Sequence, residues 1–259
     1  MMRLLVLLTA LAMPLVGWLS NKGTFGPDNA TISDQFPTLL AAAGYAFAIW
    51  GLIFLLDIVY AAWQLTGKRR TDDTLSRVAP WAAAGFALTT IWMPLFAMGQ
   101  FWICLLVIFG AMACLIRCAM ILSHDRTPQE GQWMWAWLPL SMHAGWLSLA
   151  AFLNLAQVVV AYELASTTDM LPWSLVIFAL AALMLLMVNL RMRGNIDYVI
   201  AALWALVAVY VKQSDSGLPG AQTAAWVALA IGAVLALQTV MLRRKYPGGL
   251  LPNPARAPD

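Results

Sequence analysis

The chain has 259 residues, of which 62% are hydrophobic and only 10% are charged. An ordinary soluble domain carries about 25% charged residues, so this composition excludes a water-soluble fold. The formal net charge is +3, and the basic residues lie in short clusters between apolar runs, which excludes a basic face for binding nucleic acid. The sequence therefore predicts an integral membrane protein whose surface is solvated by lipid.

Eight apolar runs have about the 20-residue length that a membrane-spanning helix needs. In chain order they are residues 2–20, 41–65, 79–98, 100–122, 134–161, 172–190, 197–213 and 221–242. Stretches that contain glycine or proline separate them, and the connection at Gly99 and Gln100 is very short. The predicted fold class is thus all-α, a polytopic bundle of about eight transmembrane helices.

The first run follows a single arginine, Arg3, and in this respect it also looks like the start of a secretory signal. No clear small-residue cleavage site follows it, because Trp18 and Leu19 precede Ser20. We therefore expect a retained first helix, with a cleaved signal as the alternative.

The distribution of lysine and arginine predicts the orientation, because cytoplasmic segments of membrane proteins retain positive charge. With eight spans, only Lys22 and Lys212 fall on one side. The other side holds Arg3, Lys68, Arg69, Arg70, Arg77, Arg117, Arg126, Arg191, Arg193, Arg243, Arg244, Lys245 and Arg256. Both termini are therefore expected in the cytoplasm, and the expected location is a bacterial-type inner (plasma) membrane, crossed several times.

A few polar side chains fall inside the predicted spans, where a charged group costs about 2.5–3.5 kcal/mol. Trp50, Phe54 and Asp57 share one face of the second span, because helical residues spaced by three or four lie on the same side. A similar stripe on the fifth span consists of His143, Trp146, Ala150 and Asn154. Two facing stripes of this kind predict an internal ligand cavity.

Asp57 and His143 form a candidate polar pair with two readings. The pair either fixes the register of two helices or serves as a proton relay or ligand contact. A metal site is not expected, since a lone histidine without further ligands is a poor site. Cys104, Cys114 and Cys118 lie in one apolar run and are expected to be packing residues.

The chain contains 13 tryptophans. Roughly half fall at span ends, where tryptophan gathers at the membrane interface. Trp50, Trp92, Trp146 and Trp204 lie near the middle of spans, and Trp102 lies just inside the fourth. These rings either stack on a planar ligand or simply pack. The sequence contains no catalytic motif, so no catalytic residues are predicted and an enzyme is not the expected class.

Four segments resemble, in order and approximate spacing, the signatures of the TspO/MBR family of translocator proteins and tryptophan-rich sensory proteins. They are residues 48–54 (AIWGLIF), residues 92–96 (WMPLF), Trp102, and residues 145–154 (GWLSLAAFLN). The resemblance covers about residues 1–163, which are the first five of the eight predicted spans.

This resemblance implies a five-helix bundle that binds planar hydrophobic ligands such as porphyrins, haem and sterols, often as a homodimer. The first loop, residues 21–40, resembles the segment that covers the pocket in this family. The ligand-binding residues expected are Trp50, Phe54, Trp92, Phe96, Trp102, Trp146, Ala150 and Asn154. The implied ligand is a tetrapyrrole or a similar molecule.

The chain is longer than the part that resembles the family. We expect a five-helix TspO-like bundle over 1–163, three additional transmembrane helices over 164–243, and a flexible cytoplasmic tail over 244–259. Phe54 stands where the family prefers tyrosine, and Asp57 and His143 are not part of its usual pattern.

The leading hypothesis is a membrane sensor or regulator that binds a planar hydrophobic ligand in a tryptophan-lined pocket. One alternative is a small-molecule or proton-coupled transporter that uses Asp57 and His143. Another is an accessory subunit whose extra helices dock on a larger membrane complex. An enzyme that acts on porphyrin through Trp146 is implied by the resemblance alone. The expected partners are the lipid bilayer, a planar hydrophobic small molecule, and a second copy or a membrane complex, with no nucleic acid.

Overall fold

A computed structural model of the chain describes residues 1–246. Over that range the chain folds into nine α-helices and contains no strand. Eight helical segments are long and apolar enough to cross a membrane. They are α1 (Met2–Asn21), α3 with its preceding 3-10 turn (Gly44–Trp63), α4 (Asp73–Ala97), α5 (Phe101–Ser123), α6 with its π-helical first turn (Trp133–Ala161), α7 (Leu171–Arg191), α8 (Ile196–Ser214) and α9 (Ala221–Lys245). The predicted all-α bundle with eight spans is confirmed.

The helix bounds differ from the apolar runs where capping, rather than hydropathy, decides the end. Helix α4 begins at Asp73, six residues before the predicted run, because the Asp72 side chain accepts a hydrogen bond from the Leu75 backbone N–H at 2.8 Å. In the second run, residues 41–43 are not helical, since the Ala43 N–H donates to the Ala208 carbonyl of α8 (2.9 Å) instead of to its own helix.

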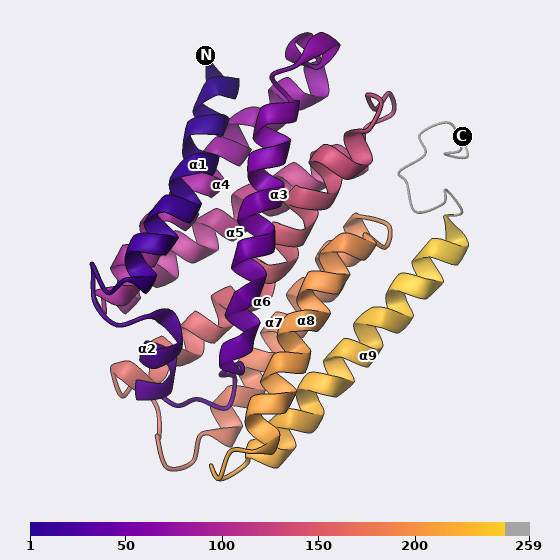
Figure 1. The fold of residues 1–259 in the computed structure, drawn as a ribbon. Coiled ribbons are helices and arrows are strands. Elements are labelled where there is room, and N and C mark those ends of the chain that lie inside the picture. Colours follow the sequence, from indigo (N-terminus) through magenta and orange to yellow (C-terminus); the bar gives the residue numbers. More distant parts are fainter. Residues whose placement is uncertain (247–259) are drawn as a thin grey trace.

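Helix α6 lies at the centre of the bundle and packs against α3, α5, α7 and α8 (Figure 1). Its most apolar stretch is 72% buried inside the protein, whereas that of α1 is only 17% buried. Helix α1 packs on α3 and α4 through residues that include Val6, Ala10 and Met13, whereas Leu8 and Leu15 on its outer side are more than half exposed. Because α6 contacts four other helices, its side chains can line a cavity inside the bundle.

The contact between α6 and α8 is especially close at Gly145. A Cβ atom at this position would overlap the backbone carbonyl of Tyr198. Only glycine allows the two helix backbones to approach so closely. This contact joins the three C-terminal helices to the first five.

Two ends of the bundle can be told apart by their charges. Arg3 donates to the backbone carbonyls of Gln64 (3.0 Å), Arg69 and Asp72 (2.7 Å), so the N-terminus lies beside the basic connection between α3 and α4. In Figure 1 these parts lie together, and α2 (Asn29–Gln35) lies at the opposite end. The basic end is the one that the charge distribution assigns to the cytoplasm.

The first loop contains a short helix that the apolar runs did not reveal. Asp28 begins α2 by accepting a hydrogen bond from the Thr31 N–H at 2.8 Å. Residues 36–43 then return without helical structure to the 3-10 turn Gly44–Ala48. Of the predicted tail, 244–259, residues 244 and 245 are the end of α9, and residues 247–259 lie outside the described residues.

Candidate ligand pocket

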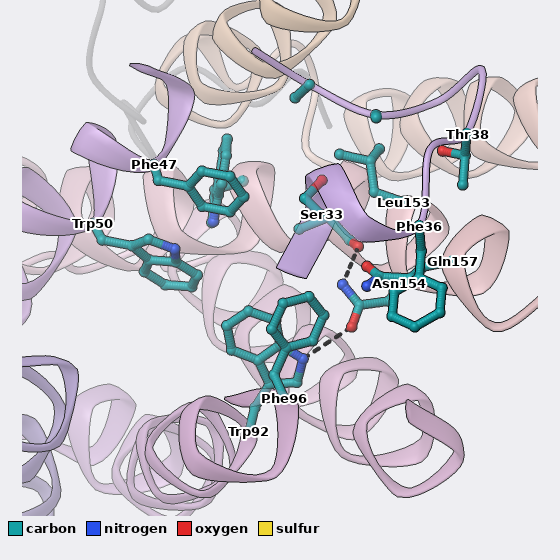
Figure 2. Close-up of a pocket in the computed structure, with 14 residues that line it drawn as sticks. Ser33, Phe36, Thr38, Phe47, Trp50, Trp92, Phe96, Leu153, Asn154 and Gln157 are labelled. Carbon is teal, nitrogen blue, oxygen red and sulfur yellow. Dashed lines mark hydrogen bonds between the residues drawn. The ribbon is translucent and has the colours of Figure 1, made fainter. Parts of the chain in front are cut away.

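A small cavity of about 40 Å³ lies between α3, α4 and α6, near the end of the bundle that carries α2. Residues 33–47, which we call the roof segment, cover it from that end (Figure 2). The residues that line it are Ser33, Phe36, Thr38, Ala41, Ala42 and Phe47 of the roof segment, Trp50 of α3, Trp92 and Phe96 of α4, and Trp146, Ala150, Leu153, Asn154 and Gln157 of α6.

Aromatic rings form the walls of the cavity. Trp50 and Trp92 lie 6.2 Å apart with an angle of 32° between their planes, and Phe96 stacks on Trp92 at 4.8 Å. Trp146 stands edge-on to Trp50, at 5.8 Å and 82°. Two rings tilted by 32° to each other and one perpendicular ring surround the cavity, and we call this site the aromatic slot.

Asn154 holds one wall of the slot in place. Its side-chain oxygen accepts a hydrogen bond from Trp92 Nε1 at 3.0 Å, and its amide nitrogen donates to the Ala150 carbonyl at 3.0 Å (Figure 2). Both polar ends of this side chain are therefore engaged within the protein. Asn154 fixes the orientation of the Trp92 ring.

The slot contains buried donors without partners. Trp50 Nε1, Trp146 Nε1 and Gln157 Nε2 have no hydrogen-bond partner among residues 1–246. An indole N–H can only donate. None of the lining residues carries a charge, so the slot offers apolar ring faces and neutral hydrogen-bond donors.

Six of the eight residues expected to bind ligand line the cavity: Trp50, Trp92, Phe96, Trp146, Ala150 and Asn154. Phe54 and Trp102 are not brought to it. The Phe54 ring lies behind Trp50, at 5.2 Å, next to Gly17 of α1. Trp102 is 48% exposed and stacks on Tyr162 at 5.6 Å. A single tryptophan at the start of a helix gives no periodicity from which its facing direction could be predicted.

Several lining residues were missed. Gln157 continues the α6 stripe three residues beyond Asn154, so helical spacing could have found it. Phe36 and Thr38 belong to the first loop, residues 21–40, which the resemblance indicated as the cover of the pocket without naming single residues, and Phe47 lies in the 3-10 turn Gly44–Ala48.

Asp57 and His143 meet outside the cavity, on the far side of Trp50 from the roof. His143 Nδ1 lies 2.7 Å from Asp57 Oδ2, and both side chains are completely buried. The Trp50 ring stands perpendicular to the His143 ring at 5.7 Å. Trp50, which contacts the His143 ring and lines the cavity, lies between this pair and the slot.

The roof segment is held by α8. Gln213 Nε2 donates to the carbonyls of Thr38 and Ala41, both at 3.0 Å, and Trp204 Nε1 donates to the Ala46 carbonyl at 3.1 Å. Trp204, one of the mid-span tryptophans, therefore supports the roof from outside and does not line the slot.

A multi-pass helical membrane protein with a tryptophan-lined slot between its helices is the class that this fold and site define. The sequence pattern of one family, described as TSPO-like protein, matches residues 3–241, and the chain belongs to this family. The match confirms the resemblance found in the first five spans and extends it through most of α9. No curated protein and no solved structure matches the chain.

Proposed function

We propose that this TSPO-like protein is a membrane sensor or regulator that binds a planar hydrophobic ligand in the aromatic slot. The observation that carries the proposal is the arrangement of Trp50, Trp92 and Trp146, which places indole rings from three different helices around one cavity. Aromatic rings bind planar molecules by stacking and by burying apolar area. A tetrapyrrole or a similar macrocycle has this shape.

The donors in the slot narrow the chemistry of the ligand. The unpartnered N–H groups of Trp50 and Trp146 each need an acceptor, because a buried donor without one costs about 1–3 kcal/mol. With no charged residue in the lining, a buried carboxylate would have no counter-ion there. The part of the ligand inside the slot is therefore neutral and carries acceptors such as ring nitrogens or carbonyl oxygens.

Binding requires the roof segment to move. A cavity of about 40 Å³ holds little more than water, whereas sites for drug-sized ligands measure roughly 300–1,000 Å³. A larger cleft of about 490 Å³ adjoins the slot and shares Ser33, Thr38 and Ala41 with it. Displacement of the roof would join the two spaces, and it would also change the outer face of the protein when ligand is bound.

Titration of the purified protein with protoporphyrin tests the proposal. Saturable quenching of tryptophan fluorescence and a shift of the porphyrin absorbance are expected. Trp50→Ala and Trp146→Ala should each weaken binding by about tenfold or more, since each removes a stacking face. Trp226→Ala is the matched control, because Trp226 is 58% exposed on α9. Binding that the two slot variants leave unchanged would contradict the proposed site.

A further inference from the structure

The Asp57–His143 pair has an unusual position for a pair that only fixes helix packing. Both side chains are fully buried in the interior of a membrane protein, 2.7 Å apart, and neither lines the aromatic slot. Phe86 stacks against the His143 ring at 6.0 Å and 10°, and Trp50 stands edge-on to it. Ionisable groups in such surroundings are costly and commonly mark proton pathways.

The hydrogen bonds around His143 define how many protons the pair holds. Thr89 Oγ1 donates its proton to the Gly85 carbonyl at 2.9 Å, so it presents a lone pair to His143 Nε2 at 3.4 Å. His143 Nε2 is then the donor to Thr89, and one further proton lies between Nδ1 and Asp57 Oδ2. With that proton the pair is neutral. Losing it leaves a buried negative charge, and gaining another leaves a positive one.

A row of unsatisfied oxygens leads away from the pair along α3. Asp57 Oδ1, Tyr60 Oη and Gln64 Oε1 all belong to residues with no exposed surface, and none has a partner among residues 1–246. Their spacing of three and four residues places them on one face of the helix. At 1.5 Å per residue, the row extends about 10 Å along the axis.

The row ends at the basic end of the bundle. Gln64 Nε2 donates to the Arg3 carbonyl at 3.4 Å, and Arg3 in turn donates to the Gln64 carbonyl at 3.0 Å. Buried polar atoms without a protein partner are normally satisfied by internal water. Internal water along this face of α3 would satisfy all three oxygens and would link the pair to the cytoplasmic end.

We propose that Asp57 and His143 form a proton-binding site that exchanges protons with the cytoplasmic end of the bundle through Tyr60 and Gln64. A proton taken from water at the cytoplasmic end passes along water molecules that Gln64 Oε1 holds by accepting their hydrogen bonds. It then passes through the Tyr60 hydroxyl, which accepts one proton as it donates its own, to Asp57 Oδ1, and it is released by the same route. No electron transfer and no other reactant is involved. Trp50 separates the site from the aromatic slot, so the charge of the pair acts directly on one wall of the slot.

Few other ionisable groups lie near the pair. On α3 the neighbour is Tyr60, on α5 it is Cys118, and on α1 the one charged residue is Arg3, at the basic end. Helix α6 contributes only His143, and the charged residues of α4 are confined to its first two turns, at the same basic end. On α8, Tyr198 is the buried ionisable residue that contacts α6, at Gly145. A pH-dependent change in charge beside the aromatic slot is therefore assigned to Asp57 and His143.

The chain offers a direct spectroscopic test because it has only two histidines. His124 is exposed and directly follows α5, so His124→Gln leaves His143 as the one imidazole without disturbing the core. Nitrogen NMR of labelled histidine in this variant, in lipid nanodiscs without ligand, reports the protonation of both ring nitrogens. The protonation of these nitrogens is expected to change as the pH is varied.

The proposed route is tested by the rate at which His143 exchanges its protons after a pH jump. Tyr60→Phe removes one hydroxyl from the row and should slow the exchange by about tenfold or more. The matched control is Tyr198→Phe, since Tyr198 is also fully buried with an unpartnered hydroxyl but lies on α8. Gln64→Leu should act like Tyr60→Phe.

The proposal is overturned if His143 keeps one protonation state at every pH at which the protein stays folded, as a pair that only fixes helix register would. It is also overturned if His143 exchanges its protons at the same rate in the Tyr60→Phe and Tyr198→Phe variants. Because the experiment contains no ligand, its outcome is independent of the proposed function of the slot.

Discussion

Helices α6 and α8 both support the aromatic slot, but they do so in different ways. Helix α6 contributes five lining side chains, among them Trp146 and Asn154, and so provides the chemistry of the site. Helix α8 contributes no lining side chain, yet it donates hydrogen bonds from Gln213 and Trp204 to three roof carbonyls and accepts one from the Ala43 N–H.

The difference is explained by the backbone of the roof segment. A non-helical stretch at or near membrane depth has carbonyl and N–H groups that lipid cannot satisfy, so such a stretch must be buried against protein that can. Helix α8 meets this need at Thr38, Ala41, Ala43 and Ala46. The C-terminal helices therefore position the roof, while α3, α4 and α6 form the walls of the slot.

The largest effect is expected at the close contact between α6 and α8. Gly145→Ala should destabilise the protein by about 3 kcal/mol, the upper end of the range for overpacking, because the backbone of Tyr198 stands in the way. Thermal unfolding in detergent measures the effect. Gly51→Ala is the control, since a Cβ there meets no atom within 4 Å. Equal melting temperatures for the two variants would contradict the close contact.

Gln213→Leu should separate the roof from α8 without touching the slot. Two buried carbonyls lose their donor, which costs about 2 kcal/mol. Hydrogen exchange of the Ala43 amide should become faster, and ligand should enter and leave the slot more rapidly. Gln238→Leu provides the comparison, because Gln238 donates to the Leu186 carbonyl far from the roof. Unchanged exchange at Ala43 would show that α8 does not hold the roof.

Asn154→Leu tests the α6 side of the comparison. Trp92 Nε1 loses its acceptor, at a cost of about 1–2 kcal/mol, and the ring is free to turn. The affinity for porphyrin should fall, while the hydrogen-exchange rates of the roof amides should stay as in the wild type. Asn189→Leu removes a buried asparagine of α7 that bonds to Gln238 and Thr239, and it should leave the affinity unchanged. A fall in affinity of the same size in both variants would argue against a specific role for Asn154.

Trp204→Phe is expected to have the smallest effect. It removes one hydrogen bond to the Ala46 carbonyl, worth about 1 kcal/mol or less, and keeps a ring beside Tyr45. Hydrogen exchange of the amides near Ala46 should become slightly faster than in Trp226→Phe, which changes the contact of Trp226 with Tyr210 but removes no hydrogen bond to the roof segment among residues 1–246. Equal exchange rates in the two variants would show that Gln213 and Ala208, and not Trp204, hold the roof segment.

The sequence alone determined the eight spans, their order and the aromatic stripes. Each span had to be a long apolar helix because lipid satisfies no backbone hydrogen bond. Within one helix, spacing fixes which side chains share a face, so periodicity was enough to identify Trp50 on α3 and Trp146, Ala150 and Asn154 on α6.

Only the tertiary structure decided which stripes face each other and what covers them. Periodicity does not fix how a helix is rotated against its neighbours, so it could not show that Trp102 is exposed or that Phe54 lies behind Trp50. The hydrogen bonds of Gln213 join residues 172 and 175 positions apart in the chain. The roof, its attachment to α8 and the meeting of Asp57 with His143 depend on such long-range contacts, which helical periodicity does not encode.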